Sequence, residues 1–269
     1  MAGYKFDYEK KVWGGDIIRV KPIYFRASRL KYALEELKKV KGKILDLGCG
    51  VGDFSEAIKF YRPDLEISAV DISANAIALA KRRGLKVKFC VADAHNLPYG
   101  VNYFDAVVCF DLIEHVKSPK KVLAEINRVL KPGGLFHTFI PTEGNVFSLE
   151  GALIALGWKA KEKYGAHPHH FPPGQVKTWI KKAGFTITKT RWGEHLVSQI
   201  IEIIYFSLLE IRGRNTTSSV EGYLARSKDR PLSKMLIIIR NILASMSYYE
   251  TTCLWWWPGL GFHATCEKK

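Results

Sequence analysis

Cysteine is scarce in this chain of 269 residues, and its five copies are scattered at positions 49, 90, 109, 253 and 266. None of them forms a CxxC pair or a cysteine/histidine set with zinc spacing, which argues against a zinc site. We therefore expect free thiols in a reducing cytosol. The first residues, "MAGYKFDYEKK", also lack the apolar centre of a signal peptide, so secretion is not expected.

Acidic residues are also few, because 26 Asp and Glu face 41 Lys and Arg and leave a net charge of +15. Such a balance suits a polyanionic partner, either nucleic acid or an anionic membrane surface. It is equally compatible with a lysine-rich surface that only keeps the protein soluble. The apolar content of 47% provides for a large core and excludes a low-complexity chain.

Apolar runs alternate with helical patterns between residues 43 and 141. Strands are predicted at "KILDLGC", "EISAVD", "KVKFCVAD", "FDAVVCFD" and "LFHTFIP", with helices at 53–61, "ANAIALAKRRG" and "SPKKVLAEINRVL". This alternation predicts right-handed βαβ units on a parallel sheet, and the continuous apolar strands predict helices on both faces. A helix "PGQVKTWIKKAG" and the strands "FTITKTRW" and "GFHATCEKK" follow.

Three glycines stand at every second position in "DLGCGVG", between the first strand and its helix. Glycine lets the backbone turn sharply and approach a ligand, and the helix behind it directs its positive end toward an anionic group. About 20 residues on, Asp71 ends the second strand, where a carboxylate can accept both hydroxyls of a ribose. The third glycine comes one residue too early for the dinucleotide motif G-x-G-x-x-G, which favours S-adenosylmethionine over NAD.

Five motifs in order make the chain resemble the class I S-adenosylmethionine-dependent methyltransferases: "LDLGCGVGDF", "AVDIS", "VADAHNLPY", "FDAVVCFDLIEHV" and "VLKPGGLF". The resemblance spans residues 40–141, continues more weakly to 192, and is nearest to the type 11 group of quinone, sterol and other small-molecule methyltransferases. It implies an α/β, doubly wound, Rossmann-like seven-stranded sheet. The antiparallel last strand, "GFHATCEKK", would lie between strands five and six.

The resemblance also assigns residues to S-adenosyl-L-methionine. Gly48 and Gly50 would line the methionine part, Asp71 would accept the ribose hydroxyls, and Asp93 would accept from the adenine amino group. Phe110 departs from the small or polar residue often found at its position. The full implied set is Asp46, Gly48, Cys49, Gly50, Asp71, Ile72, Asp93, Ala94, Phe110 and Asp111.

Methyl transfer from a sulfonium is an in-line displacement that depends on alignment, and a base is needed only if the nucleophile loses a proton. The candidate catalytic residues are His115 in "DLIEHV", Glu143 just past the fifth strand, and His170 in "AHPHHF". His115 is also compatible with packing or helix capping, and His170 with an ordinary loop. The three histidines of "AHPHHF" lack helical spacing and a nearby cysteine, so no metal site is predicted.

No long uncharged hydrophobic run exists, but two apolar segments lie between residues 195 and 258, "LVSQIIEIIYFSLLEI" and "MLIIIRNILASMSYYETTCLWWW", joined by a basic loop. The first would form a helix of about 24 Å, which is shorter than a bilayer core of about 30 Å. Glu202 and Glu210 in the first and Arg240 in the second also argue against membrane spans. Two interpretations remain: a helical cap or dimer face, or a patch that docks on anionic lipid and admits an isoprenoid, quinone or sterol-like acceptor.

We divide the chain into an N-terminal helical flap (1–42), a cofactor-binding core (43–194), a helical insertion that caps the substrate (195–258) and the last core strand (259–269). The predicted function is S-adenosylmethionine-dependent methyl transfer to a small apolar or lipid-like acceptor, in the cytoplasm or peripherally on a membrane. The alternatives are an RNA or tRNA methyltransferase, which only the net charge favours, and a cofactor-binding scaffold without catalysis. An NAD oxidoreductase is disfavoured by the glycine spacing, and no oligomeric state is predicted.

Overall fold

The computed structural model describes residues 9, 14–15, 17–165, 169–212 and 231–269. Most of the predicted flap before residue 14, His167 and most of the basic loop after residue 212 lie outside the described residues. The strands are β1 (Lys43–Leu47), β2 (Glu66–Asp71), β3 (Lys88–Val91), β4 (Phe104–Phe110), β5 (Leu130–Pro141), β6 (Phe185–Gly193) and β7 (Gly261–Lys268). The helices are α1 (Ala27–Leu37), α2 (Asp53–Tyr61), α3 (Ala74–Arg82), α4 (Pro119–Val129), α5 (Leu149–Ala155), α6 (Ala160–Gly165), α7 (Pro173–Lys182), α8 (Leu196–Arg212) and α10 (Pro231–Cys253).

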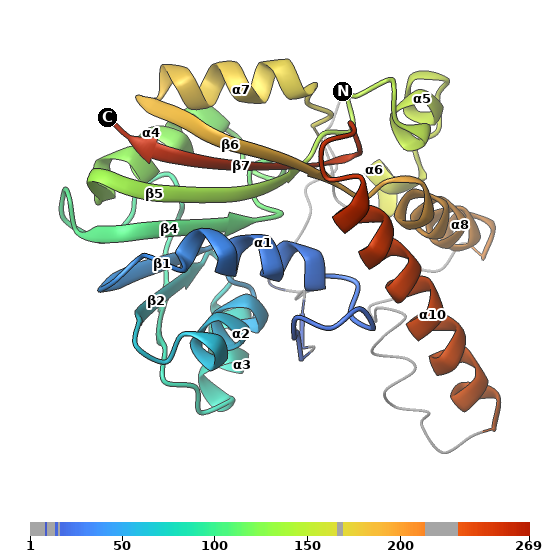
Figure 1. Cartoon of the computed structure of the whole chain (residues 1–269), viewed down its shortest axis with the longest axis horizontal. Helices are drawn as coiled ribbons and strands as arrows, with labels where there is room; N and C mark the ends of the chain where they lie inside the picture. The colour runs from blue at the N-terminus through green and yellow to red at the C-terminus, as the bar shows by residue number, and fades with distance from the viewer. Residues whose placement is uncertain (1–8, 10–13, 16, 166–168, 213–230) are drawn as a thin grey trace.

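These strands form one sheet in the order β3-β2-β1-β4-β5-β7-β6 (Figure 1). The first five strands pair in parallel, whereas β7 is antiparallel to both of its neighbours, β5 and β6. The prediction of a doubly wound α/β sheet with a reversed last strand between strands five and six is therefore confirmed.

Helices cover both faces of the sheet, because neighbouring residues of each strand bury their side chains on opposite sides. Ile44 packs with α1 and α2 on one face, and Leu45 packs with α4 and α7 on the other. Both side chains are fully buried. The continuous apolar strands of the sequence thus correspond to a sheet with two covered faces.

Strand β5 is longer than the sequence pattern predicts. The segment "KPGG" was expected to separate a helix from a strand that starts at Leu135, but β5 already begins at Leu130. Its pairing with β4 shifts register, because Phe104 faces Leu130 whereas Ala106 faces Leu135. Residues 131–134 stand opposite the single residue Asp105 and form a bulge, which accommodates a proline and two glycines at the beginning of the strand.

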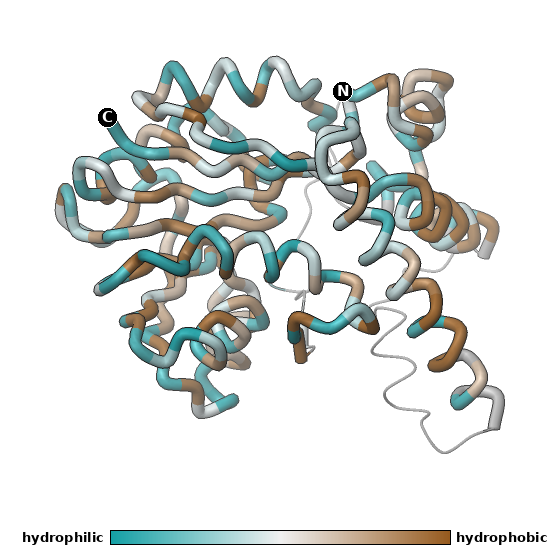
Figure 2. The backbone as a smooth tube through the Cα atoms, in the orientation of Figure 1, coloured by the Kyte–Doolittle hydropathy of each residue, from teal (hydrophilic) through white to brown (hydrophobic). Residues whose placement is uncertain are grey.

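The two apolar segments form α8 and α10, between β6 and β7 in the chain. Helix α8 packs against α5, α6 and α10, and α10 also contacts α1 and β6. In Figure 2 the hydrophobic colour continues along both helices at one end of the molecule. Within the described ranges, none of the helices is both long and apolar enough to cross a membrane.

Candidate active site

The carboxyl ends of β3, β2, β1 and β4 meet at one edge of the sheet, because these strands are adjacent and parallel. In open α/β sheets this edge is where ligands bind. All ten residues implied in cofactor binding lie at these strand ends or just after them. Ala94 is buried among core side chains under the edge, whereas Ile72 and Asp93 are exposed.

The glycine loop between β1 and α2 depends on residues without a side chain. Gly48, Gly50 and Gly52 all have positive φ angles, of 79°, 52° and 84°. A Cβ atom on Gly48 would lie 3.1 Å from the methyl carbons of Leu112, and one on Gly52 would lie 2.8 Å from the ring of Phe89. Helix α2 starts directly after the loop, so its positive end faces the same edge of the sheet.

Two carboxylates flank an exposed apolar side chain beside this loop. Asp71 accepts hydrogen bonds from two backbone N–H groups, those of Gly50 (2.8 Å) and Ser73 (2.9 Å). Asp93 accepts from the backbone N–H of His95 (2.9 Å), and this bond lowers the pKa of Asp93. A carboxylate has lone pairs beyond those used here. With Ile72 exposed between them, Asp71 and Asp93 can accept further hydrogen bonds from a nucleoside.

Two further implied residues, Asp46 and Phe110, have buried side chains, and that of Cys49 is partly buried. Asp46 is 2% exposed and accepts from the Ser55 hydroxyl at 2.5 Å. Burial raises the pKa of Asp46 to about 7, although the Ser55 bond opposes this. The ring of Phe110 stacks on Phe54 with centroids 4.2 Å apart, and burial raises the pKa of the Cys49 thiol. These side chains therefore support the loop from within the core.

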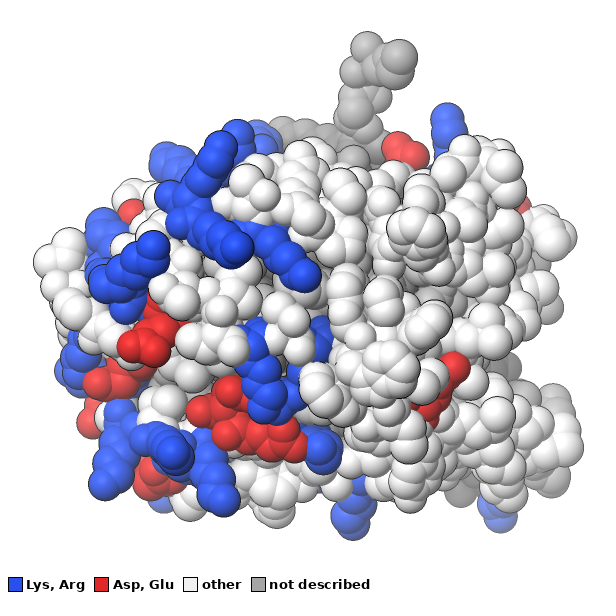
Figure 3. All heavy atoms as spheres, turned by 45° about the horizontal axis from the view of Figure 1, so that its top comes forward, with Lys and Arg blue, Asp and Glu red and all other residues white. Residues whose placement is uncertain are grey.

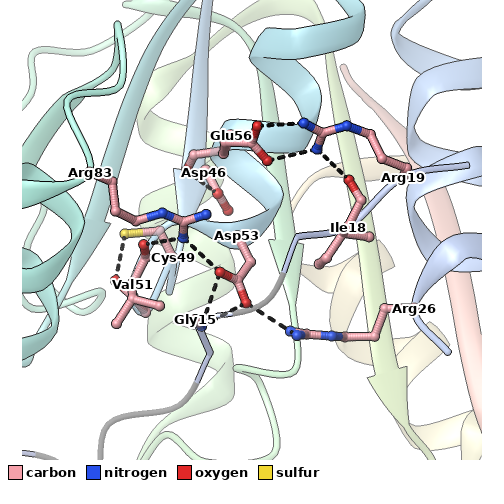
Figure 4. A network of polar contacts seen from close by, with 12 residues as sticks. Gly15, Ile18, Arg19, Arg26, Asp46, Cys49, Val51, Asp53, Glu56 and Arg83 are labelled. Carbon is pink, nitrogen blue, oxygen red and sulfur yellow. Dashed lines mark hydrogen bonds and ion pairs between the residues drawn. The ribbon is translucent and has the colours of Figure 1, made fainter. Parts of the chain in front are cut away.

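The first residue of α2 holds the N-terminal segment against the glycine loop (Figure 4). Asp53 is 3% exposed and accepts from the backbone N–H of Gly15, 3.1 Å from both carboxylate oxygens. It also pairs with Arg26 at 3.1 Å and with Arg83 of the residues after α3 at 2.7 Å. Gly15 and Arg26 thus both contact the helix end that faces the cofactor edge.

A cavity of about 260 Å³ lies beside the cofactor edge, between α1, α8, α10 and the ends of β5, β6 and β7. Its wall consists mostly of polar and charged side chains, together with a few apolar side chains. The lining residues are Phe25, Arg26, Ser28, Arg29, Phe139, Gly193, Glu194, Ser198, Ile201, Glu202, Ser247, Thr251 and His263. This cavity is the candidate site for the acceptor.

Arg29 of α1 connects the cavity to the cofactor edge. Its guanidinium bonds Asp111, which follows β4, and Glu194, which follows β6. The guanidinium also lies 3.8 Å from the centroid of the Phe139 ring. Burial lowers the pKa of Arg29, but the two carboxylates outweigh it and raise the pKa overall. One cation is therefore shared by an implied cofactor residue and a residue of the cavity wall.

The three residues predicted to be catalytic do not line this cavity. His115 lies after β4, with its Nε2 atom 3.8 Å from Glu114. Glu143 and His170 meet each other, with 3.4 Å between Nε2 and Oε2. Their catalytic roles stay predictions, because none of the three lies in the cavity wall. The residues described contain no group of three side chains that could hold a metal ion.

Behind the cavity, one lysine holds three carboxylates together. The side chain of Lys161 is 5% exposed, and its Nζ atom lies 3.0 Å from Glu143, 2.7 Å from Glu150 and 2.6 Å from Glu202. Burial raises the pKa of Glu150 to about 8, although Lys161 opposes this. Glu202 also lines the cavity, so this ion cluster joins α5, α6 and α8 to the acceptor site.

Sequence reasoning missed Arg29, Glu194 and His263. No sequence motif distinguishes Arg29, because it lies within an ordinary amphipathic helix. Glu194 could have been found, since it directly follows β6, and β6 runs parallel to the first five strands. A charged residue at that position lies at the ligand-binding edge of the sheet.

The chain is similar to known methyltransferases. A family described as a methyltransferase domain matches residues 45–138. The demethylmenaquinone methyltransferase of Thermus thermophilus is 32% identical over 170 residues, which are 56% of this chain and 77% of that protein. The ubiquinone biosynthesis O-methyltransferase of Coxiella burnetii is 28% identical over 194 residues, or 68% and 80% of the two chains. A solved S-adenosylmethionine-dependent methyltransferase from Mesorhizobium loti shares the fold, with a TM-score of 0.54, 16% identity and coverage of 91% and 98%.

The edge of the sheet fits the cofactor of these enzymes. A Cβ on Gly48 would be tight against Leu112 and one on Gly52 would overlap Phe89, so the shape of the loop depends on these glycines. The Asp71 and Asp93 carboxylates lie at the same strand edge, where the resemblance assigns them to the ribose and the adenine. The protein is an enzyme that uses S-adenosylmethionine. The chain belongs to the class I S-adenosylmethionine-dependent methyltransferases.

Proposed function

We propose that this enzyme methylates the hydroxylated ring of a quinone-like acceptor that carries an apolar tail. One observation carries the proposal: α10 and residues 23–29 contribute side chains both to the polar cavity and to an apolar groove. The groove has a volume of about 530 Å³ and is lined by Ile23, Ile238, Asn241, Ile242, Ser245, Met246 and Tyr249. In this proposal the ring binds in the cavity, and the tail passes around α10 to the groove. The names of the two quinone-related relatives support the same class.

The proposed reaction needs little covalent chemistry from the protein. The bound cofactor supplies an electrophilic methyl group on a sulfonium sulfur. Gly48 and Gly50 would hold its methionine part, Asp71 its ribose and Asp93 its adenine. The protein then has to align the acceptor oxygen with the methyl group and exclude water, and such positioning accounts for much of the rate gain in reactions of this type.

The surface of α8 and α10 supports an apolar acceptor and docking on a membrane. On each helix the exposed apolar side chains recur at helical spacing and form one stripe. The α8 stripe contains Ile200, Ile204, Leu208 and Ile211, and the α10 stripe contains Met235, Ile238, Ile239, Ile242, Met246 and Tyr249. Trp255, Trp256 and Trp257 are also exposed after α10, and aromatic side chains of this kind favour the headgroup boundary.

The charge distribution on the face in Figure 3 also fits a membrane surface better than a nucleic acid around the cavity. Basic side chains gather on the left half, whereas the right half, the side of α5, α8 and α10, is largely uncharged. We infer that the apolar stripes enter the interfacial layer of an anionic membrane, where a lipid-like acceptor is dissolved. The chain's net charge of +15 would add long-range attraction.

The proposal can be tested by methyl transfer from labelled S-adenosylmethionine to three probes: a geranylated catechol, catechol without a tail, and bulk tRNA. We expect methylation of the geranylated catechol with a much lower KM than catechol. Equal KM values for the two catechols would contradict the role of the groove, and methylation of tRNA alone would refute the proposal.

Docking can be tested by flotation with phosphatidylglycerol vesicles. The wild-type protein should float with them, and the double variant I238D/I242D should not. The control V101D adds one such negative charge at an exposed loop residue outside α8 and α10, and it should still float. Wild-type protein that stays in the bottom fraction of the gradient, apart from the vesicles, would contradict membrane docking.

A further inference from the structure

Two residues of the acceptor edge have a backbone conformation that non-glycine residues rarely adopt. Asp111 has a φ angle of 49° and Glu194 has one of 53°. Such strain concentrates at functional sites and persists only where surrounding contacts hold it. Here both carboxylates are held by one buried guanidinium, that of Arg29. The structure therefore keeps Glu194 in a fixed position next to the cofactor side of the site.

The surroundings of Glu194 suit a group that takes up a proton. Its Oε1 atom accepts from Arg29, while its Oε2 atom lies 3.3 Å from where a Cβ on Gly261 would be. A side chain on Gly261 would also overlap the Phe139 ring, so this glycine keeps the cavity wall open. Burial raises the pKa of Glu194, and Arg29 opposes the rise. The other charged groups that influence it are Glu202, Lys161 and Asp111.

A second feature of the same cavity points to a bound ligand. His263 of β7 is 1% exposed and lines the cavity, yet no described residue hydrogen-bonds either of its ring nitrogens. Its ring packs against Phe139, with centroids 4.7 Å apart, and against Tyr32 at 5.0 Å. Burial lowers the pKa of His263 well below its usual range, so the ring is neutral, with one donor and one acceptor. Buried polar groups normally have a partner, and a molecule bound in the cavity that His263 lines can supply one.

Accepting the proposed function, we propose that Glu194 takes the proton of the acceptor hydroxyl during methyl transfer, and that His263 hydrogen-bonds the same ring. In this step the acceptor oxygen forms a bond to the methyl carbon. The bond from that carbon to sulfur breaks, and its electron pair stays on sulfur. The hydroxyl proton moves to the Glu194 carboxylate and then to solvent. Arg29 orients the carboxylate and keeps it beside Asp111.

The test compares wild type with Glu194→Gln, using geranylated catechol as the probe. The turnover number of the variant at pH 7 should fall by about 100-fold or more, which is the scale of general-base catalysis. Its rate should then rise with pH, because the phenol ionises without help at high pH. The affinity for S-adenosylhomocysteine, measured by calorimetry, should stay unchanged and shows that the variant is folded.

Two further variants separate a proton acceptor from a structural residue. Glu194→Asp keeps the carboxylate and should keep the shape of the wild-type pH profile. Glu150→Gln, a control, replaces another buried carboxyl, which lies behind the cavity and outside its wall, with an amide and should leave the profile unchanged. For His263, the variant His263→Phe should weaken binding of the probe in the presence of S-adenosylhomocysteine by about 5-fold or more, the scale of one hydrogen bond.

The outcomes distinguish this inference from the proposed function. If wild type methylates the probe and Glu194→Gln has the same rate and pH profile, Glu194 is not the proton acceptor and the proposed function stands. If wild type neither binds nor methylates the probe, the proposed acceptor class fails and the inference fails with it. Unchanged binding of the probe by His263→Phe would remove His263 from the site.

Discussion

Replacing Lys161 with methionine removes the cation that three buried carboxylates share. Methionine has a similar length and fills the same space without a charge. In the native protein the Nζ atom lies between 2.6 and 3.0 Å from Glu143, Glu150 and Glu202. The variant therefore changes the electrostatics of the cluster and leaves the packing of α5, α6 and α8 nearly as it was.

The expected cost follows from how each carboxyl can respond. Glu150, with a pKa of about 8, is largely protonated at pH 7, so it loses little electrostatic stabilisation when Lys161 is replaced. The Glu202 side chain is 33% exposed and can turn toward water. Glu143 is 1% exposed and cannot turn toward water, so most of the lost electrostatic stabilisation is lost at its carboxylate. Removing one partner of a buried ion pair costs about 3–5 kcal/mol. His170, 3.4 Å from Glu143, offsets part of it, so we expect about 3 kcal/mol.

Urea unfolding of wild type, Lys161→Met and the exposed control Lys159→Met at pH 7 measures this cost. The control should change the free energy of unfolding by less than about 0.5 kcal/mol. The loss in Lys161→Met should shrink toward pH 5, because protonation removes the buried negative charge. A variant within about 1 kcal/mol of wild type at pH 7, or a loss that grows as the pH falls, would refute the reasoning.

Three further predictions concern the same molecule. The pKa of Glu150 is raised on folding from about 4.5 to about 8, so its contribution to stability is present at low pH and is lost as the pH rises through that window; Glu150→Gln should flatten this decline in urea unfolding between pH 5 and 8, and an identical decline would contradict it. Asp71→Asn should raise the Kd for S-adenosylhomocysteine by about 10- to 100-fold in calorimetry, since charged hydrogen bonds are worth about 1.5–3 kcal/mol, and an unchanged Kd would exclude Asp71 from cofactor binding. Gly52→Ala should destabilise the protein by about 2–3 kcal/mol, because its Cβ would meet Phe89 at 2.8 Å and its φ angle is positive. The control Gly84→Ala, with a positive φ angle and open space around it, should lower the free energy of unfolding by only about 1 kcal/mol. Equal losses in the two variants would show that the Phe89 contact is unimportant.

The cofactor half of the molecule could be predicted from local sequence. Each of its residues follows a strand that the alternation of apolar and helical segments had already predicted, and parallel strands bring their carboxyl ends to one edge. Asp71 and Gly50, 21 positions apart, are hydrogen-bonded for this reason. The place of β7 between β5 and β6 came from the resemblance, because no local pattern specifies which strands pair.

The acceptor half could not be predicted in this way. Arg29, Glu194 and His263 come from α1, the end of β6 and β7, and up to 234 positions of sequence separate them. Glu143 and His170 were predicted as catalytic residues from their place in the chain, and the structure brings them together outside the cavity wall. Which side chains meet across elements depends on packing angles and on small residues such as Gly261, and no periodicity records these.

The sequence by itself determined the class of fold and the strand edge at which the residues implied in cofactor binding gather. It could do so because backbone hydrogen bonding and side-chain alternation repeat at short spacing, and because the loop between β1 and α2 requires glycine at particular positions. Only the tertiary structure decided where the acceptor cavity lies and which charges face it. The reason is that a buried charge is set by its neighbours in space: Arg29 holds Asp111 and Glu194 together only after α1 has packed across the ends of the strands.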